Sequence, residues 1–455
     1  MLLIALPMLV SNASEMLMIF VDRIFLSRLG SVYMNAAMGG GITCFMMITF
    51  FLGLCGYSTA IVAQYLGAGK KEKLTTVLVQ ACLIAVLAYP LVILARPLGH
   101  KYFDVMDIVN PQLSLQKTYF NVLVYTVIFS MLRNCLSSFF SGIGKTKIVM
   151  LGAVVAMLVN IFFNYVLIYG KFGFPALGIT GAAVGTIIGG FSGFLVLLVG
   201  FFKLAKRYDY NFKGALCFES AIMKKLLRFG YPAGIEMFLN VLAFSIVVLI
   251  FQSHSPISAT AASIVFNWDM VTFVPLIGVE IAVTSLFGRY MGAKEPDIAH
   301  KSAMSGLKIG WMYSAVIFSM FVFIPDVLAG VFRPDMSDGI YDKALPAAVF
   351  MIRAAALYVT VEAIFVVFIG ALRGAGDTFW AMCLSVSLHW ILVPILYVML
   401  KVNNTAPQQA WLALVTVFAV FSILVYLRYR TGKWRSISII DQSVSSVGIP
   451  HEDIL

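Results

Sequence analysis

Apolar stretches long enough to cross a membrane as helices recur along the whole chain, separated by short segments rich in glycine, proline and charge. A bilayer core about 30 Å thick needs roughly 20 apolar residues per helical crossing. The pattern therefore predicts an all-α polytopic membrane protein with twelve transmembrane helices. They are expected at 3–28, 36–66, 75–96, 114–140, 148–169, 177–202, 225–252, 257–290, 302–324, 345–371, 378–400 and 409–428.

The first stretch begins almost at residue 1, where a secretory signal could also stand. It has no charged region before its apolar core and no small-residue cleavage site. The sequence therefore predicts a retained first membrane helix. A start so close to the helix is also what a chain lacking a short N-terminal tail would show.

The two sets of six stretches share motifs at a nearly constant separation. Three pairs of segments match, the first two pairs 225 residues apart and the third pair 232. Two matches at one separation indicate an internal duplication. The pairs are ALPMLVSNASEM around Pro7 with FGYPAGIEMFLN around Pro232, AQYLGA at 63–68 with GRYMGA at 288–293, and SGIGKT at 141–146 with RGAGDT at 373–378.

Because each half contains an even number of helices, the halves are expected to be parallel repeats related by an axis along the membrane normal. A central cavity between two six-helix bundles would follow. The expected division is an N-terminal lobe at 1–202, a cytoplasmic linker at 203–224, a C-terminal lobe at 225–428 and a cytoplasmic tail at 429–455.

The composition agrees with a chain that has lipid as its solvent. Of the 455 residues 61% are hydrophobic and 12% are charged, with a mean hydropathy of +0.95. Soluble domains have about 45–50% apolar and about 25% charged residues. The six cysteines stand singly, with no CxxC pair and no histidine at ligand spacing, so neither a metal site nor a disulfide framework is predicted.

The formal charge of +11 could suggest a nucleic-acid partner, but its distribution favours membrane topology. Most lysines and arginines fall in loops on one side of the twelve-helix arrangement, such as Lys70, Lys71 and Lys73 or the group at 428–435. The positive-inside rule then places both termini in the cytoplasm. We expect a multi-pass protein of the cell (inner) membrane that contacts anionic lipids and binds no nucleic acid.

Ionisable side chains inside membrane helices cost about 2.5–3.5 kcal/mol or more, which makes each a functional candidate. Ser11, Glu15 and Asp22 lie on one stripe of the first helix. Asp22 is predicted to bind a proton or Na⁺; the alternative is a structural, hydrogen-bonded aspartate. Asn160 and Asn164, one turn apart, could add the oxygen ligands that hard cations prefer, or could join helices by hydrogen bonds.

The second half carries four acidic residues within its predicted helices. Asp269 and Glu280, eleven residues apart, share a helix face. We predict that the four line a cation or substrate cavity; the alternative is that they pair with membrane-embedded bases such as Arg133 or Arg353. The four are Glu236, Asp269, Glu280 and Glu362.

In this order and spacing, five segments resemble the multidrug and toxic compound extrusion (MATE) family over nearly the whole chain. They are FVDRIFLSRLG, STAIVAQYLGAG, NIFFNYVLIYGKFGFPALGITGAAVGT, GYPAGIEMFLN and ALRGAGDT. The resemblance implies a V-shaped bundle of two lobes that exports cationic, amphipathic small molecules in exchange for H⁺ or Na⁺. We expect a monomer with no other cofactor, surrounded by membrane lipids.

Several single residues resemble functional positions of that family. Asp22 resembles its helix 1 carboxylate, and Asn160 and Asn164 resemble the helix 5 partners of that carboxylate. Thr186 would complete the set. Pro7 resembles the proline at which helix 1 bends in some members.

The second half departs from the family pattern at one position. Asp269 and Glu362 match acidic positions of helices 8 and 10, but Asn240 stands where many members have Glu, and Glu236 lies one turn earlier. This departure shifts the expected cation site to the Asp22 cluster. Glu15, where Gln is common, would add a carboxylate beside that cluster.

The predicted mechanism is alternating access, in which the ion and the drug favour different conformations. A lipid-linked oligosaccharide flippase of the same superfamily is the first alternative, although such proteins tend to have more cationic cavities. A major-facilitator transporter usually has an Asp-Arg pair in the loop that reads GAGKKEKL here. A membrane enzyme would need a catalytic dyad or metal cluster, and none is found. A non-transporting receptor or scaffold is the last alternative.

Overall fold

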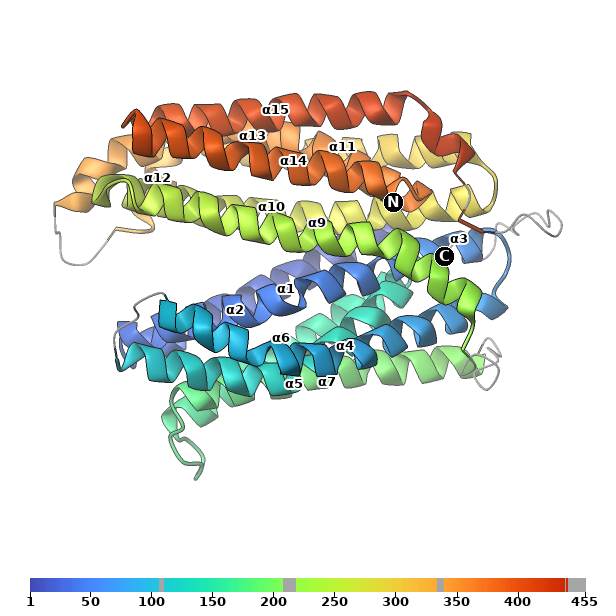
Figure 1. Cartoon of the computed structure of the whole chain (residues 1–455), viewed down its shortest axis with the longest axis horizontal. Helices are drawn as coiled ribbons and strands as arrows, with labels where there is room; N and C mark the ends of the chain where they lie inside the picture. The colour runs from blue at the N-terminus through green and yellow to red at the C-terminus, as the bar shows by residue number, and fades with distance from the viewer. Residues whose placement is uncertain (106–109, 208–217, 334–338, 438, 441–455) are drawn as a thin grey trace.

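The computed structural model describes residues 1–105, 110–207, 218–333, 339–437, 439 and 440. Parts of the predicted linker (203–224) and of the predicted tail (429–455) lie outside the described residues. Within the described part, the regular structure is helical throughout (Figure 1). This confirms the predicted all-α class.

In the part of the chain that the structure describes, twelve segments are long and apolar enough to cross a membrane, which is the predicted number. Ten are single helices and two consist of two consecutive helical pieces. The first six are α1 (Leu2–Ser27), α2 (Ser31–Gly56) with α3 (Ser58–Gly67), α4 (Glu72–Val105), α5 (Gln112–Gly142), α6 (Thr146–Tyr169) and α7 (Ile179–Arg207).

The second six are α9 (Ser220–Gln252), α10 (Pro256–Gly292), α11 (Pro296–Phe323), α13 (Ile340–Ala375), α14 (Thr378–Tyr397) with the π-helical turn η1 (Val398–Val402), and α15 (Pro407–Arg430). Two short helices, α12 (Pro325–Gly330) and η2 (Lys433–Ser436), lie outside the spans.

Most helices extend beyond the apolar stretches that predicted them, because helical hydrogen bonding continues into polar residues at the membrane surface. For example, α4 begins at Glu72 and α13 begins at Ile340. The stretch expected as one helix at 36–66 is divided at Tyr57 into α2 and α3. Pro7 lies inside α1, which continues as one helix on both sides of it.

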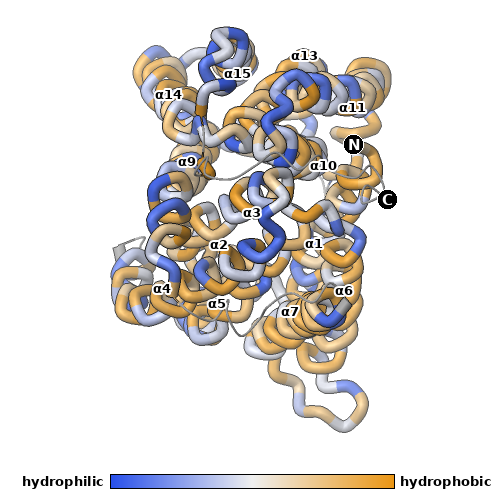
Figure 2. Tube along the Cα trace, turned by 90° about the vertical axis from the view of Figure 1, so that its right-hand side faces the viewer, coloured by the Kyte–Doolittle hydropathy of each residue, from blue (hydrophilic) through white to orange (hydrophobic). Residues whose placement is uncertain are grey.

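The helices form two bundles, the first lobe (α1–α7) and the second lobe (α9–α15), which diverge toward the left of Figure 1. Each lobe has its own apolar core, with Phe120 and Phe139 in the first and Trp411 in the second. Helix α9 contributes to both cores, through Leu226 near its start and Phe251 near its end. Figure 2, viewed along the bundle, shows that hydrophobic residues make up most of the helices of both lobes.

The lobes approach each other most closely near the end that carries α3, at the right of Figure 1. Two glycines make this contact, which we call the glycine seam (Gly67, Gly292, Gln64 and Arg289). A Cβ on Gly67 would lie 1.7 Å from the carbonyl oxygen of Arg289, and a Cβ on Gly292 would lie 1.9 Å from that of Gln64. Only glycine permits so close an approach of two backbones.

The glycine seam joins the two copies of the repeated motif reciprocally. The separation of 225 residues that relates the motifs pairs Gly67 with Gly292 and Gln64 with Arg289. Gly67 therefore packs on Arg289, and Gly292 packs on Gln64, which is the counterpart of Arg289. Such self-complementary contact is typical of a two-fold axis, and it supports the parallel arrangement of the repeats.

Candidate functional site

Four residues predicted from the sequence meet in the middle of the first lobe, where α1, α6 and α7 pack together. Asn164 donates a hydrogen bond to Oδ1 of Asp22, and the Thr186 hydroxyl lies 3.2 Å from Oδ2 of Asp22. Asn160 donates to Thr186 at 3.3 Å and accepts from Asn164 at 3.3 Å. We call these four residues the Asp22 cluster.

The Asp22 cluster is rich in oxygen atoms and shielded from solvent. Asp22, Asn160 and Asn164 are buried, and the groups that contact the carboxylate are neutral amides and a hydroxyl. The Oδ1 atom of Asn164 is buried and has no hydrogen-bond partner among the described residues. A buried oxygen without a donor is unfavourable, and a hard cation such as Na⁺, or a proton on a neighbouring oxygen, would satisfy it.

Two glycines in α7 make room for the cluster. Gly185 and Gly189 lie one turn apart and face the two asparagines of α6. A Cβ on Gly185 would lie 1.9 Å from Oδ1 of Asn164, and a Cβ on Gly189 would lie 2.6 Å from Cβ of Asn160. The sequence analysis missed these glycines, although their spacing of four residues matches that of Asn160 and Asn164.

Two further neighbours of Asp22 were also missed. Arg23, next to Asp22 in α1, and Tyr119 in α5 both interact with its carboxyl group electrostatically. The adjacent position of Arg23 in the sequence was a usable signal, whereas Tyr119 is more than ninety positions away and nothing in α1 points to it.

Glu15 does not join the hydrogen-bonded group around Asp22. Its Oε1 accepts a hydrogen bond from Nη1 of Arg133 in α5 at 2.9 Å. Both side chains are partly exposed, 42% for Glu15 and 25% for Arg133. Glu15 and Arg133 therefore form an ion pair of the kind that was considered as the alternative for the acidic residues of the second half.

In the second lobe, Asp269 and Glu362 lie near each other between α10 and α13. Glu362 is buried, accepts a hydrogen bond from the Tyr358 hydroxyl at 2.5 Å, and interacts electrostatically with Asp269. Oδ1 of Asp269 and Oε2 of Glu362 are both buried without a hydrogen-bond partner in the described part of the chain. Tyr358 was missed, although it stands four residues before Glu362 on the same helix face.

The other two acids of the second lobe share one arginine. Arg373, near the end of α13, contacts Glu236 of α9 at 2.9 Å and also pairs with Glu280 of α10. The sequence analysis considered Arg353 as a partner, but Arg353 instead lies 3.7 Å from Asp326. The charges of Glu236 and Glu280 are thus partly balanced within the protein.

Asn240, the residue that departs from the family pattern, contacts neither acidic pair. Its amide donates to the Ser385 hydroxyl of α14 at 2.7 Å. Within the described residues, no group of three or more His, Cys, Asp or Glu side chains could hold a metal ion.

Comparison with known proteins gives a consistent result. The family model described as MatE matches residues 7–166 and 232–398. The probable multidrug resistance protein NorM of Thermotoga maritima is 27% identical over 453 residues, which cover 96% of this chain and 93% of that protein.

Solved structures share the fold at low sequence identity. An outward-facing multidrug resistance MATE family transporter superposes with a TM-score of 0.85 at 19% identity over 95% of both chains. A transporter of the MOP superfamily from Pyrococcus furiosus, described as having a binding pocket of reverse polarity that suggests a different function, superposes with a TM-score of 0.86 at 19% identity over 96% of both chains. These matches establish the two-lobe fold.

Proposed function

Since the chain belongs to the MATE family of membrane transporters, we propose that it exports cationic, amphipathic small molecules in exchange for H⁺ or Na⁺ by alternating access. The family consists of ion-coupled, multi-pass membrane transporters and not of enzymes. A relative that aligns over almost its whole length is described as a probable multidrug resistance protein, which supports the substrate class.

The observation that carries the proposal is the Asp22 cluster. A carboxylate within a membrane span is costly, and Asp22 is held by neutral groups rather than by a contacting base. Its charge is therefore available to a proton or to Na⁺. The amide oxygens of Asn160 and Asn164 and the Thr186 hydroxyl would supply the remaining oxygen ligands for Na⁺.

Coupling requires that the ion and the drug favour different conformations of the first lobe. A proton or Na⁺ on Asp22 would neutralise the carboxylate and allow α1, α6 and α7 to pack closely around it. Without the ion, the buried negative charge would attract a cationic drug to the cavity side of α1. The two ligands would thus compete through the same charge, and this competition links drug export to ion entry.

The glycine seam supports alternating access between two discrete states. Arg373 and Gly374 reinforce it, because their carbonyls accept hydrogen bonds from Tyr57 at 3.1 Å and from Gln64 at 2.8 Å, across the lobes. These contacts would break together when the lobes part. Lys70 follows the seam directly in sequence, so under the proposed topology the closed end is the cytoplasmic one.

In the second lobe we propose Asp269 and Glu362 as the acidic groups that attract the cationic substrate or a second ion. Each has a buried carboxylate oxygen without a hydrogen-bond partner among the described residues. Glu236 and Glu280 are engaged by Arg373. We assign these two a role in holding α9, α10 and α13 together.

A lipid-linked oligosaccharide flippase is the competing proposal. A neighbour with this fold is described as having a binding pocket of reverse polarity that suggests a different function. An anionic lipid-linked substrate would need basic groups in the cavity. The acidic character of both buried clusters favours a cationic substrate instead.

The arrangement in the cell is part of the same proposal. Both termini would be cytoplasmic in the inner membrane, with lobes at 1–202 and 225–428, a linker at 203–224 and a tail at 429–455. The protein would act as a monomer, because all residues of both acidic clusters lie within one chain.

Ethidium accumulation tests the proposal in cells that lack their own pumps. Cells with the wild-type protein should accumulate several-fold less dye than cells with empty vector, and Asp22→Asn should remove this difference at equal expression. Asp104→Asn is the matched control, because Asp104 is exposed and pairs with Lys117 at 2.5 Å outside the cluster. Equal efflux by wild type and Asp22→Asn would contradict the role of Asp22.

A further inference from the structure

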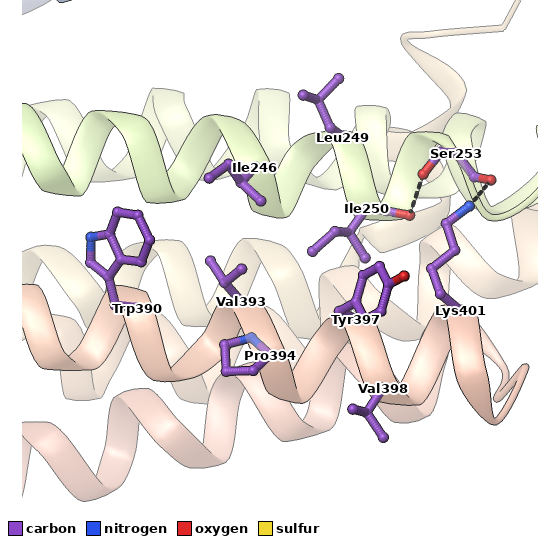
Figure 3. A pocket seen from close by; sticks show the side chains of 10 residues that line it. All are labelled: Ile246, Leu249, Ile250, Ser253, Trp390, Val393, Pro394, Tyr397, Val398 and Lys401. Carbon is purple, nitrogen blue, oxygen red and sulfur yellow. Dashed lines mark hydrogen bonds between the residues drawn. The ribbon is translucent and has the colours of Figure 1, made fainter.

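An apolar groove of about 700 Å³ lies between α9 and α14, away from the acidic clusters (Figure 3). Eight of its ten lining residues are apolar or aromatic, and the only charged one is Lys401. Both helices belong to membrane spans, so the molecules that face this groove are those of the bilayer.

The groove has one polar end and one apolar end. Lys401 lies in η1 near the end of its span, and its ammonium group donates to the carbonyl of Ser253, just past the end of α9. Trp390 lies at the other end (Figure 3). Eleven residues of helix separate the two, or about 16 Å at about 1.5 Å per residue. This is about half of the roughly 30 Å hydrocarbon core, the depth of one leaflet.

Lys401 can bind an additional anion. An ammonium group has three N–H donors, and the contact with Ser253 uses one of them. No acidic residue lines the groove to compensate the positive charge. A cationic ligand would be repelled at this end, whereas a phosphate at headgroup depth would be attracted.

An irregular helix forms one wall of the groove. Pro394 has no N–H and cannot donate to the carbonyl of Trp390, and α14 continues into the π-helical turn η1. The indole N–H of Trp390 is buried and has no acceptor in the part of the chain that the structure describes. Helices α9 and α14 therefore leave a gap along their contact that the protein itself does not fill.

We propose that this groove binds an anionic phospholipid of the surrounding bilayer, with its phosphate at Lys401 and one acyl chain along the apolar wall toward Trp390. The length of the groove, its single positive charge at headgroup depth and its position on a membrane span together specify this occupant. The site is separate from the substrate path proposed above and does not depend on it.

A second apolar groove with a single lysine lies on the first lobe. It measures about 530 Å³, lies between α6 and α7, and is apolar except for Lys203 near the end of α7. Lys203 lies at the opposite end of the molecule from Lys401, because α7 is the sixth membrane span and α14 with η1 is the eleventh, and an even-numbered and an odd-numbered span end on opposite sides. The two grooves would thus hold one lipid in each leaflet.

Native mass spectrometry of the full-length protein in detergent tests the proposal. The probes are palmitoyl-oleoyl phosphatidylglycerol and the phosphatidylcholine with the same chains, added in equal amounts. The wild-type protein should retain the anionic lipid about fivefold more than the neutral one, the ratio expected for one lysine near an anionic group. Lys401→Gln should lower this preference, and Val393→Trp, which fills the groove, should lower the retention of both lipids.

Lys171→Gln is the matched control, because Lys171 is an exposed lysine at the same predicted membrane surface and lines neither groove. It should keep the wild-type preference. Equal retention of both lipids by the wild type, or the same loss of preference in Lys171→Gln as in Lys401→Gln, would overturn the proposal. If Val393→Trp does not fold, the Lys401→Gln comparison decides alone.

Discussion

The two lobes share their helix arrangement but differ in what they bury at equivalent crossings. The separations of 225 and 232 residues that relate the repeats place Val247 where the first lobe has Asp22, and Leu392 and Leu396 where it has Asn160 and Asn164. All three replacements are buried. Thr186 corresponds in the same way to Phe418, which is also buried. The second lobe therefore packs the same crossing with apolar side chains.

The acidic residues of the second lobe are likewise missing from the first lobe. Asp269 and Glu362 correspond to Cys44 and Ser130 of the first lobe, neither of which is a carboxylic acid. Each lobe thus has carboxylate side chains without a basic ion-pair partner among the described residues, at a helix contact where the other lobe has no acidic residue. Since the fold accepts an apolar version of the Asp22 crossing, packing does not require the polar side chains there, and their cost in lipid points to a function.

The largest effect is expected for the ion pairs of Arg373, which stabilise the second lobe. Arg373→Met would leave the buried Glu236 and the mostly buried Glu280 without their partner, and breaking a buried ion pair in this way costs about 3–5 kcal/mol. Unfolding in mixed micelles, followed by tryptophan fluorescence, measures the loss. The triple variant Glu236→Gln, Glu280→Gln, Arg373→Met should recover most of it.

Arg353→Met is the control for this experiment. Arg353 and its partner Asp326 are 55% and 72% exposed, and an exposed pair contributes about 0–1 kcal/mol. A similar loss in both variants would contradict a special role for the Arg373 pairs.

Gly185→Val makes the first lobe resemble the second, which has Val417 at the equivalent position. The new side chain would displace Asn164 from Asp22, because even its Cβ would lie 1.9 Å from the amide oxygen. Ethidium efflux should fall at least tenfold while the protein still folds. Gly190→Val, in the same helix but facing open space, should keep most of the activity; equal loss in both would indicate damage to α7 alone.

The glycine seam allows a test in which the lobes should behave alike. Gly67→Ala and Gly292→Ala each place a Cβ within 2 Å of a backbone oxygen of the other lobe, so each should favour separation of the lobes at this end. Labelling of Ser285→Cys, which replaces a hydroxyl bonded across the lobes to Ser141, should become about fivefold faster in a background without native cysteines. Different effects of the two glycine variants would contradict the two-fold relation.

The smallest effect is expected at Glu15. Its pair with Arg133 is partly exposed, so Glu15→Gln should change the free energy of unfolding by about 1 kcal/mol or less. Efflux should change less than twofold, because Glu15 is outside the hydrogen-bonded group around Asp22. A loss as complete as that of Asp22→Asn would extend the coupling site along α1.

The sequence predicted the elements well because membrane helices have strong local signals. Twelve spans followed from apolar length, the duplication from repeated motifs, and the polar stripe with Asp22 from helical periodicity. Asn160 and Asn164 were candidates for the same site from their helical spacing, and the family resemblance added Thr186. The structure brings all four together.

What the sequence did not predict depends on how helices face each other. Periodicity indicates which residues of one helix share a face. It does not indicate which face of another helix packs against them. Nothing in the sequence therefore indicated that Arg373 pairs with Glu236 and Glu280. The space made by Gly185 for Asn164 was missed for the same reason, because glycine leaves no pattern of its own.

The central claim is that Asp22 couples the ion to the drug, and transport in proteoliposomes tests it most directly. Drug export by the purified protein is measured with and without an imposed Na⁺ or proton gradient, for the wild type, Asp22→Asn and Glu362→Gln. We predict that the gradient accelerates export by the wild type and by Glu362→Gln, the latter with a reduced rate, and has no effect on Asp22→Asn. Gradient-driven export that persists in Asp22→Asn would contradict the account.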